Sequence, residues 1–258
     1  MSILVEAIPA LHDNYIWGMA MQDGCVIVDP GEAGPVVEYL HSKPVPCKNV
    51  LLTHHHYDHT GGVAELASIY PDITFIGPNL KHKPKWFKDI TSHTDFHLSF
   101  LNTAVRVLHT PGHTLDHVCY YFPDLGYLFC GDVLFSAGCG RLLEGTPQQM
   151  FDSLQQIMSL PDNTILFPAH EYTLNNLRFA AYIEPNNPHI AEYKKKTDVK
   201  RLANQPSLPS TLALEKQINP FLRSHIPSVM DNARRLSGDI CDSALTTFTT
   251  LRKLKDQY

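Results

Sequence analysis

The stretch Thr53-His54-His55-His56-Tyr57-Asp58-His59 follows the apolar run Val50-Leu51-Leu52 and precedes Gly61-Gly62. Positions 54, 56, 58 and 59 fit the spacing H-x-H-x-D-H. Side chains alternate on a chain leaving a strand, so residues 54, 56 and 58 are predicted to project to one side. Imidazoles converging on one point suit a metal such as zinc. The alternatives are a purification tag, which would lie at a terminus, and a solvated histidine loop.

Composition limits the class of protein. The 258 residues are 43% hydrophobic and 18% charged, which is typical of a soluble globular chain. The net charge of −5 argues against nucleic-acid binding as the main activity. No apolar run is long enough for a membrane span, and the six cysteines form no C-x-x-C pair. We therefore expect a cytoplasmic, monomeric enzyme with reduced thiols and no nucleic-acid or membrane partner.

Hydrophobic patterning predicts a layered α/β region followed by a helical region. Strands are predicted near 4–8 and at 14–19, 25–28, 50–53, 73–76, 105–108, 118–122, 127–130 and 165–167, and helices at 35–41, 63–68 and after the Thr146-Pro147 start signal. Beyond residue 170, helices are predicted at 174–183, 188–204, 211–219, 228–237 and 242–255, with no strand among them. Residues 78–97 are predicted to be a basic, aromatic loop without site residues.

Three further candidate ligands follow predicted strands: His113 in Pro-Gly-His-Thr, Asp132 after Gly131, and His170 in Pro-Ala-His-Glu. A single zinc takes four ligands, so seven protein groups fit two ions better than one. The expected partition gives His54, His56 and His113 to one ion and Asp58, His59 and His170 to the other, with Asp132 as the bridge. Asp58 could instead accept a hydrogen bond from a bound hydroxide. Zinc is favoured, although iron and manganese suit the same ligands.

This constellation resembles the metallo-β-lactamase superfamily. Further stretches resemble glyoxalase II, the hydroxyacylglutathione hydrolases, from residue 7 to the end of the chain. They are Asp13-Asn14-Tyr15, Gly138-Cys139-Gly140-Arg141, the run from Ala169 to Asn176, Asn219-Pro220-Phe221-Leu222-Arg223 and the ending Leu251-Arg252-Lys253-Leu254-Lys255-Asp256. The resemblance implies a four-layer αββα sandwich at 1–170, carrying the metals and the chemistry. It also implies a small all-helical domain at 171–258 that binds the glutathione part of the substrate.

The implied reaction is hydrolysis of S-2-hydroxyacylglutathione, such as S-D-lactoylglutathione, to glutathione and a hydroxy acid such as D-lactate. This is the second step of methylglyoxal detoxification. Two dications lower the pKa of a bridging water toward about 7, which supplies a nucleophile at neutral pH. The leaving thiolate has a pKa of about 8.5–9 and needs no general acid. Asp58 and Asp132 are the carboxylates expected to act in catalysis.

The resemblance also implies four substrate-binding residues, which are Arg141, Tyr172, Arg252 and Lys255. Arg252 and Lys255 could instead be cations placed in the last turn of a helix, and Tyr172 could be a buried aromatic near the metals. Leu143 departs from the pattern, because some relatives have an aromatic residue there. Cys139 lacks a dedicated histidine partner and is rejected as a nucleophile.

Other functions compete with hydrolysis. A mononuclear iron dioxygenase acting on glutathione persulfide shares the fold, but it would leave part of the second metal site unused. A non-catalytic metal-binding protein, a nuclease and a β-lactamase are the remaining alternatives, of which the last two are least consistent with the charge and the C-terminal region.

Overall fold

A computed structural model describes residues 3–21, 23–78, 87–90 and 95–258 of the chain. Within these residues the chain forms two compact units, one of Met1–His109 with Asp116–Gly131 and one of Thr110–Leu115 with Asp132–Tyr258. Of the predicted basic loop, residues 79–86 and 91–94 lie outside the described ranges. The predicted domain boundary after residue 170 stays a prediction.

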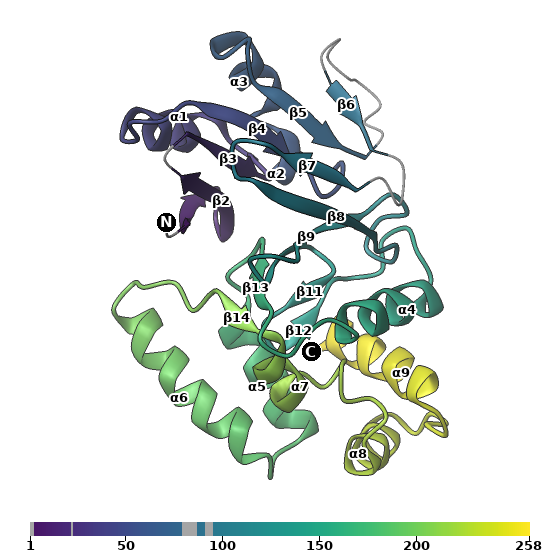
Figure 1. Cartoon of the computed structure of the whole chain (residues 1–258). Coiled ribbons are helices and arrows are strands. Elements are labelled where there is room, and N and C mark those ends of the chain that lie inside the picture. Colours follow the sequence, from purple (N-terminus) through teal and green to yellow (C-terminus); the bar gives the residue numbers. More distant parts are fainter. Residues whose placement is uncertain (1–2, 22, 79–86, 91–94) are drawn as a thin grey trace. The chain divides into compact units, whose positions relative to one another are not determined.

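The first unit is built on a sheet with the strand order β1-β2-β3-β4-β5-β6. Its strands are β1 (Leu4–Ala10), β2 (Asn14–Met21), β3 (Gly24–Val28), β4 (Cys47–Leu51), β5 (Thr74–Gly77) and β6 (Phe87–Asp89). The first three strands pair antiparallel, and those from β3 to β6 pair parallel. The helices α1 (Ala33–His41) and α3 (Val63–Ile69) connect parallel strands and lie on one face of the sheet (Figure 1). The predicted strand–helix–strand pattern is confirmed here.

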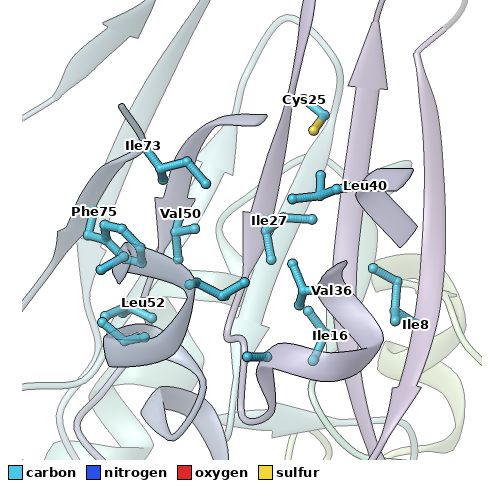
Figure 2. Packing of buried hydrophobic residues seen from close by; sticks show 14 of the residues in the cluster. Ile8, Ile16, Cys25, Ile27, Val36, Leu40, Val50, Leu52, Ile73 and Phe75 are labelled. Carbon is cyan, nitrogen blue, oxygen red and sulfur yellow. The ribbon is translucent and has the colours of Figure 1, made fainter. Parts of the chain in front are cut away.

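The core of this unit lies between that sheet face and the two helices. Ile27, Val50 and Phe75 from neighbouring strands pack with Val36 of α1 and Leu66 of α3, and all five are fully buried. Figure 2 shows strand and helix side chains meeting in one cluster. Burying each such side chain stabilises the fold by about 1.5–3 kcal/mol, so this cluster holds the parallel strands rigidly.

A second set of strands pairs antiparallel in the first unit. It comprises β7 (Phe96–Leu98), β8 (Thr103–His109), β9 (Val118–Phe122) and β10 (Tyr127–Gly131). The fully buried Tyr120 of β9 donates its hydroxyl to the carbonyl oxygen of Leu52 at 2.6 Å, which ties this sheet to the first one. The loop prediction for 78–97 was wrong where β6 and β7 lie, because strands of three residues are too short to show alternation.

The second unit is mostly helical. Its elements are β11 (Leu134–Phe135), β12 (Gly138–Cys139), α4 (Pro147–Met158), β13 (Ile165–Pro168), α5 (Thr173–Ile183), α6 (Pro188–Leu202), β14 (Ser210–Thr211), α7 (Leu212–Ile218), α8 (Pro227–Ser237) and α9 (Ala244–Gln257). The helix start at Thr146 is confirmed by a capping box with Gln149. The predicted absence of a strand after residue 170 was wrong, because β14 pairs with β13. None of the helices in the described ranges is long and apolar enough to cross a bilayer.

Candidate metal centre

The histidine-rich stretch follows the end of β4 in the first unit. β4 ends at Leu51, and a short helix, α2 (Tyr57–Thr60), begins within the motif with His56 as its N-cap. Asp58 and His59 therefore lie on a helical turn, so the strand-alternation argument was wrong beyond His56. Successive side chains on a helix point about 100° apart, whereas those on a strand alternate between two faces. The directions of Asp58 and His59 are therefore set by the helical turn.

The four predicted ligands of the motif lie close together within the first unit. Nε2 of His54 lies 3.0 Å from Nδ1 of His56, and the ring centroids of His54 and His59 are 4.1 Å apart. Nε2 of His59 is 3.4 Å from Oδ2 of Asp58. His54 and His59 are fully buried. Converging ring nitrogens and a carboxylate in a buried setting are the donor set that divalent transition metals take, so these residues fit such an ion.

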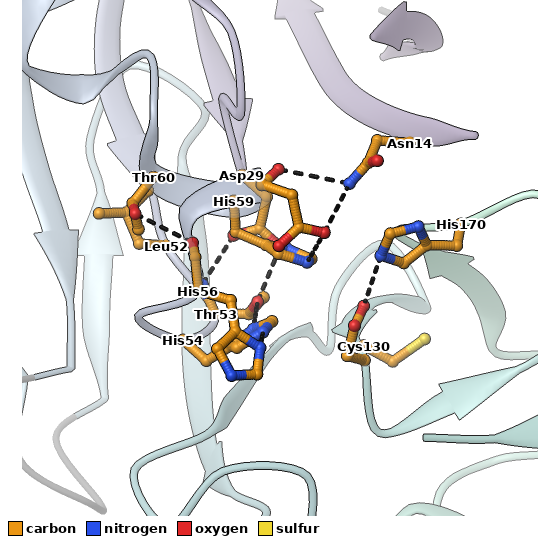
Figure 3. Close-up of polar contacts among 12 residues, drawn as sticks. Asn14, Asp29, Leu52, Thr53, His54, His56, His59, Thr60, Cys130 and His170 are labelled. Atoms are coloured by element: carbon orange, nitrogen blue, oxygen red, sulfur yellow. Dashed lines mark hydrogen bonds and ion pairs between the residues drawn. The ribbon is translucent and has the colours of Figure 1, made fainter. Parts of the chain in front are cut away.

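Asp29 orients this cluster, and sequence reasoning missed it. It follows the end of β3, which runs parallel to β4, so Asp29 and the motif leave the same edge of the sheet. Its carboxylate accepts from the backbone N–H and the hydroxyl of Thr53, both at 2.7 Å, and lies 2.9 Å from Nδ1 of His59 (Figure 3). Holding a histidine through Nδ1 leaves Nε2 as the coordinating nitrogen and fixes the ring orientation.

Backbone strain supports a functional role for Asp29. Its φ of 53° lies in the left-handed region, which is uncommon for a residue other than glycine. The hydrogen bonds to Thr53 and His59 hold it there, since such strain persists only where the surroundings enforce it. The one sequence signal was its place at the end of a buried strand, which also describes the predicted ligands.

Asn14 and Gly31 complete the support of Asp58. The side-chain amide of Asn14 donates to Oδ2 of Asp58 at 3.1 Å and to its carbonyl oxygen at 3.3 Å. A Cβ on Gly31 would lie 2.0 Å from that carbonyl oxygen, so only glycine allows this approach of the two loops. Asn14 lies in one of the stretches that carried the resemblance, and its contact with Asp58 gives that stretch a structural role.

The second unit brings together the other three predicted ligands, with His113 and His170 on either side of Asp132. Oδ2 of Asp132 lies 3.4 Å from Nε2 of His113, and Oδ1 lies 3.3 Å from Nε2 of His170. All three residues are buried. Nδ1 of His113 lies 2.9 Å from the carbonyl oxygen of Arg141, which again directs Nε2 toward the carboxylate. Each carboxylate oxygen therefore faces a different histidine, an arrangement that suits a bridging ligand.

Tyr172 packs directly on a predicted ligand. Its ring is stacked on His170 with centroids 4.7 Å apart and planes 5° apart, and Phe135 lies edge-on to both rings. This contact fixes the orientation of His170. Tyr172 therefore lies beside a predicted metal ligand, as the alternative interpretation expected. Its predicted contact with the substrate stays a prediction.

A pocket of about 510 Å³ in the second unit contains all four predicted substrate-binding residues. Arg141, Tyr172, Arg252 and Lys255 line it together with His113 and Asp132. The pocket thus extends from two predicted ligands to a group of cations. A volume of this size suits a small molecule, and the cations suit an anionic one.

Arg252 is buried and holds the strand beside the pocket. Its Nη1 donates to the carbonyl oxygen of Cys139 at 2.9 Å, and its Nη2 pairs with Oδ1 of Asp256 at 2.8 Å. Gly140 follows Cys139, and a Cβ on it would lie 1.9 Å from the carbonyl oxygen of Asp132. The arginine at the far end of the chain therefore supports the segment that bears Arg141 and packs on Asp132.

Lys255 is a cation placed among other cations. Burial, and then the charges of Arg252 and Arg141, lower the pKa of Lys255 to about 8. Its Nζ lies 3.4 Å from the carbonyl oxygen of Asn175 and 5.3 Å from the ring centre of Phe179. Burial also raises the pKa of the Cys139 thiol to about 11, which agrees with the rejection of this residue as a nucleophile.

The β11–β12 hairpin beside the pocket is held by polar side chains from later helices. Glu215 of α7 is fully buried and accepts from the hydroxyl of Ser136 at 2.8 Å and from the backbone N–H of Ala137 at 2.7 Å. Asn219 donates to the carbonyl oxygen of Gly138 at 2.9 Å, and Asn176 donates to that of Ser136 at 3.1 Å. Asn176 and Asn219 belong to stretches that carried the resemblance. They act by shaping the hairpin that leads to Arg141.

Comparison with known families accounts for almost the whole chain. Residues 19–170 match the metallo-beta-lactamase superfamily, and residues 171–258 match the hydroxyacylglutathione hydrolase C-terminus. A hydroxyacylglutathione hydrolase from Edwardsiella ictaluri is 45% identical over 97% of this chain and 98% of its own length. One from Vibrio cholerae is 44% identical over 98% and 99%. This chain belongs to the hydroxyacylglutathione hydrolase family. The recognition made from the sequence motifs is confirmed.

Comparison with solved structures confirms the metallo-beta-lactamase fold that was predicted for this chain. The BLEG-1 B3 metallo-beta-lactamase matches with a TM-score of 0.64 at 23% identity, covering 85% of this chain and 99% of the other. ETHE1 from Myxococcus xanthus matches with a TM-score of 0.67 at 20% identity, covering 98% and 91%. At these sequence identities, the similarity to the two solved structures shows the fold alone. The match of residues 171–258 to the hydroxyacylglutathione hydrolase C-terminus is what distinguishes the family from the rest of the superfamily.

Proposed function

We propose that this chain hydrolyses S-2-hydroxyacylglutathione, with S-D-lactoylglutathione as the representative substrate, to glutathione and a 2-hydroxy acid. The observation that carries the proposal is the similarity to hydroxyacylglutathione hydrolases over both the metal-ligand motifs and the C-terminal region. The pocket of the second unit agrees with it, because cations and two predicted metal ligands line the same volume.

The seven residues His54, His56, Asp58, His59, His113, Asp132 and His170 are proposed to hold two divalent metal ions. Support comes from the buried donor sets within each unit and from the two-sided contacts of Asp132. Zinc is the proposed metal, with iron and manganese as alternatives for the same donors. When bound, the ions would supply a nucleophilic water at neutral pH and would polarise the thioester carbonyl.

The chain's own residues would bind and orient the substrate. Arg141 and Lys255 offer positive charge to the carboxylates of the glutathione part, and Arg252 holds the segment from Cys139 to Arg141 in place. Asp29 and Tyr172 fix the rings of His59 and His170. The glutathione thiol has a pKa of about 8.5–9, so its thiolate is a good leaving group and no general acid is required at the sulfur.

The two parts of the chain on either side of the predicted boundary are proposed to have different roles. We assign the metal chemistry to residues 1–170 and binding of the glutathione part mainly to residues 171–258. The chain is proposed to act as a cytoplasmic monomer without nucleic-acid or membrane partners. Six free cysteines and the net charge of −5 support this assignment.

The test is hydrolysis of glutathione thioesters that differ only in the acyl group. Release of free thiol from S-D-lactoylglutathione, faster than from the acetyl thioester, is the expected result. Glutathione persulfide with an oxygen electrode provides the comparison with the dioxygenase alternative. Oxygen consumption with one iron per chain and no thioester turnover would overturn the proposal.

A further inference from the structure

Two cysteines face each other across neighbouring strands of the first sheet. Cys25 of β3 is the register partner of Cys47, the first residue of β4. Neighbouring strands are about 4.8 Å apart, and a disulfide needs Cα atoms about 4.4–6.8 Å apart. Both side chains pack into the same core cluster. The backbone therefore already meets the main distance requirement for a bond between them.

Only one residue of this pair is partly exposed. Cys25 is fully buried, whereas Cys47 is partly exposed. Cys47 lines a hollow of about 360 Å³, walled by apolar residues such as Val45, Pro46 and Ile73. The other cysteines, Cys119, Cys130, Cys139 and Cys241, are buried. Among the six cysteines of the sequence, all of which are described, Cys47 is thus the most accessible.

The two thiols also differ in how readily they lose a proton. A hydrogen bond from the Cys47 thiol lowers the pKa of Cys25, and the charge of Lys43 lowers it further against the opposing effect of burial. The same hydrogen bond, followed by burial, raises the pKa of Cys47. Cys25 is therefore the thiol of the pair that ionises more readily. Because the thiolate is the attacking species in thiol–disulfide exchange, the lowered pKa of Cys25 favours its attack on a mixed disulfide at Cys47.

We propose that Cys25 and Cys47 form a reversible disulfide by exchange with a small-molecule disulfide such as oxidised glutathione. Cys47 lines the hollow and is the residue that the reagent can reach. Its thiol gives its proton to solvent, and its sulfur attacks one sulfur of the reagent, whose S–S bond breaks and releases one glutathione thiolate. The Cys25 thiolate then attacks Sγ of Cys47 and releases the second glutathione. The protein loses two protons and two electrons, and the reagent gains them as two thiols.

The local backbone has room for the required adjustment. A disulfide brings the Cβ atoms to about 3.8 Å, which is closer than in an open parallel pair. The β3–β4 register shifts between Cys25 and Val26, and Cys47 is where β4 begins, so a small movement breaks little of the ladder. At their other ends these strands lead to Asp29 and Thr53. The bond would therefore tie together the strands that carry this part of the metal centre.

The test uses the metal-loaded full chain incubated with oxidised glutathione. Remaining thiols are alkylated, the chain is digested and the peptides are identified by mass spectrometry. A Cys25–Cys47 cross-linked peptide is expected, with a mass loss of about 2 Da for the two hydrogens removed. Reduced glutathione in excess should reverse it. Thermal unfolding should occur about 5 °C higher in the oxidised chain, since the cross-link restricts the unfolded state.

Variants separate this pathway from general oxidation. C25S should stop at a single glutathione adduct on Cys47, and C47S should leave Cys25 unmodified. C241A, which removes a buried cysteine elsewhere, should keep the cross-link. The proposal is overturned if the wild-type chain gives no Cys25–Cys47 peptide, or if adducts spread evenly over all six cysteines. The wild-type result decides the question even if a variant folds poorly.

Discussion

At the scale of single residues, the candidate site depends on residues that are not among the predicted metal ligands. Asp29 contacts both Thr53 and His59, and it is held at a strained φ to do so. Asn14 and Gly31 support Asp58 in the same way. A motif search finds ligands because their spacing is fixed locally. It misses these partners because they lie 24 to 44 residues away from the groups they orient.

The first prediction concerns Asp29. D29N keeps the size of the side chain but weakens the contact with Nδ1 of His59. Metal affinity should fall about 10–100-fold, which is typical when a residue orienting a metal ligand is lost. Titration with a competing chelator measures this directly. Asp72, exposed on a loop of the same unit, gives the control D72N. Unchanged metal affinity in D29N would show that Asp29 is only a structural residue.

The second prediction concerns the charge of Lys255. Its pKa is lowered to about 8, so the charge is present below pH 8 and is lost as the pH rises through that value. KM for the glutathione thioester should therefore rise between pH 7 and 9, because the carboxylates of the substrate lose a cation. K255R should flatten this rise, since arginine stays charged throughout this pH range. An identical KM profile in both proteins would remove Lys255 from substrate binding.

At the scale of elements, the helices of the second unit shape the pocket by holding short strands. α9 contributes Arg252 to the carbonyl oxygen of Cys139, and α7 contributes Glu215 to the turn between β11 and β12. Two-residue strands such as β11 and β12 have little stability of their own. Their position is therefore set by these polar contacts.

The third prediction tests α9. R252A should chiefly raise KM, by about tenfold, because the segment bearing Arg141 loses its support while no predicted metal ligand is itself substituted. Steady-state kinetics on S-D-lactoylglutathione measure the effect. K253A, at the exposed neighbouring position, is the matched control and should behave as wild type. A fall in kcat at constant KM would contradict this role.

The fourth prediction tests α7. Glu215 accepts hydrogen bonds from Ser136, Ala137, Ser210 and Asn219, so E215A leaves several buried donors unsatisfied. The free energy of unfolding should fall by about 3 kcal/mol, measured by urea denaturation. E192Q, which alters an exposed pair on α6, should change it by no more than about 0.5 kcal/mol. Equal midpoints for E215A and the wild type would contradict the structural role of Glu215.

Sequence patterns predicted most elements because their signals are local. The buried runs at β3, β4 and β13 and the capping box at Thr146 are each complete within a few residues. The missed elements, β6, β7, β11, β12, β14 and α2, are two to four residues long and depend on pairing with other segments or on the local turn. The same difference applies to the candidate site. The ligand motifs were recognised from the sequence, whereas residues that orient the ligands, such as Asp29, were not.

At the scale of the whole molecule, the predicted ligands are divided between the two units. The first contributes four residues from the segment between β4 and the end of α2, and the second contributes three, with Asp132 between the two histidines. The family match covers both parts of the chain, so the metal motifs and the glutathione-type C-terminal region occur in one protein. We therefore propose that metal chemistry and choice of substrate come from different stretches of the same sequence.

The most direct test measures metal content and turnover of S-D-lactoylglutathione on the same samples of wild-type protein and D132A. We expect about two divalent ions per chain in the wild type, together with rapid release of glutathione. D132A should lose most of both, because the proposed bridging carboxylate is gone. D231N, altered at an exposed site on α8, should match the wild type. Full activity in metal-depleted D132A would contradict the account.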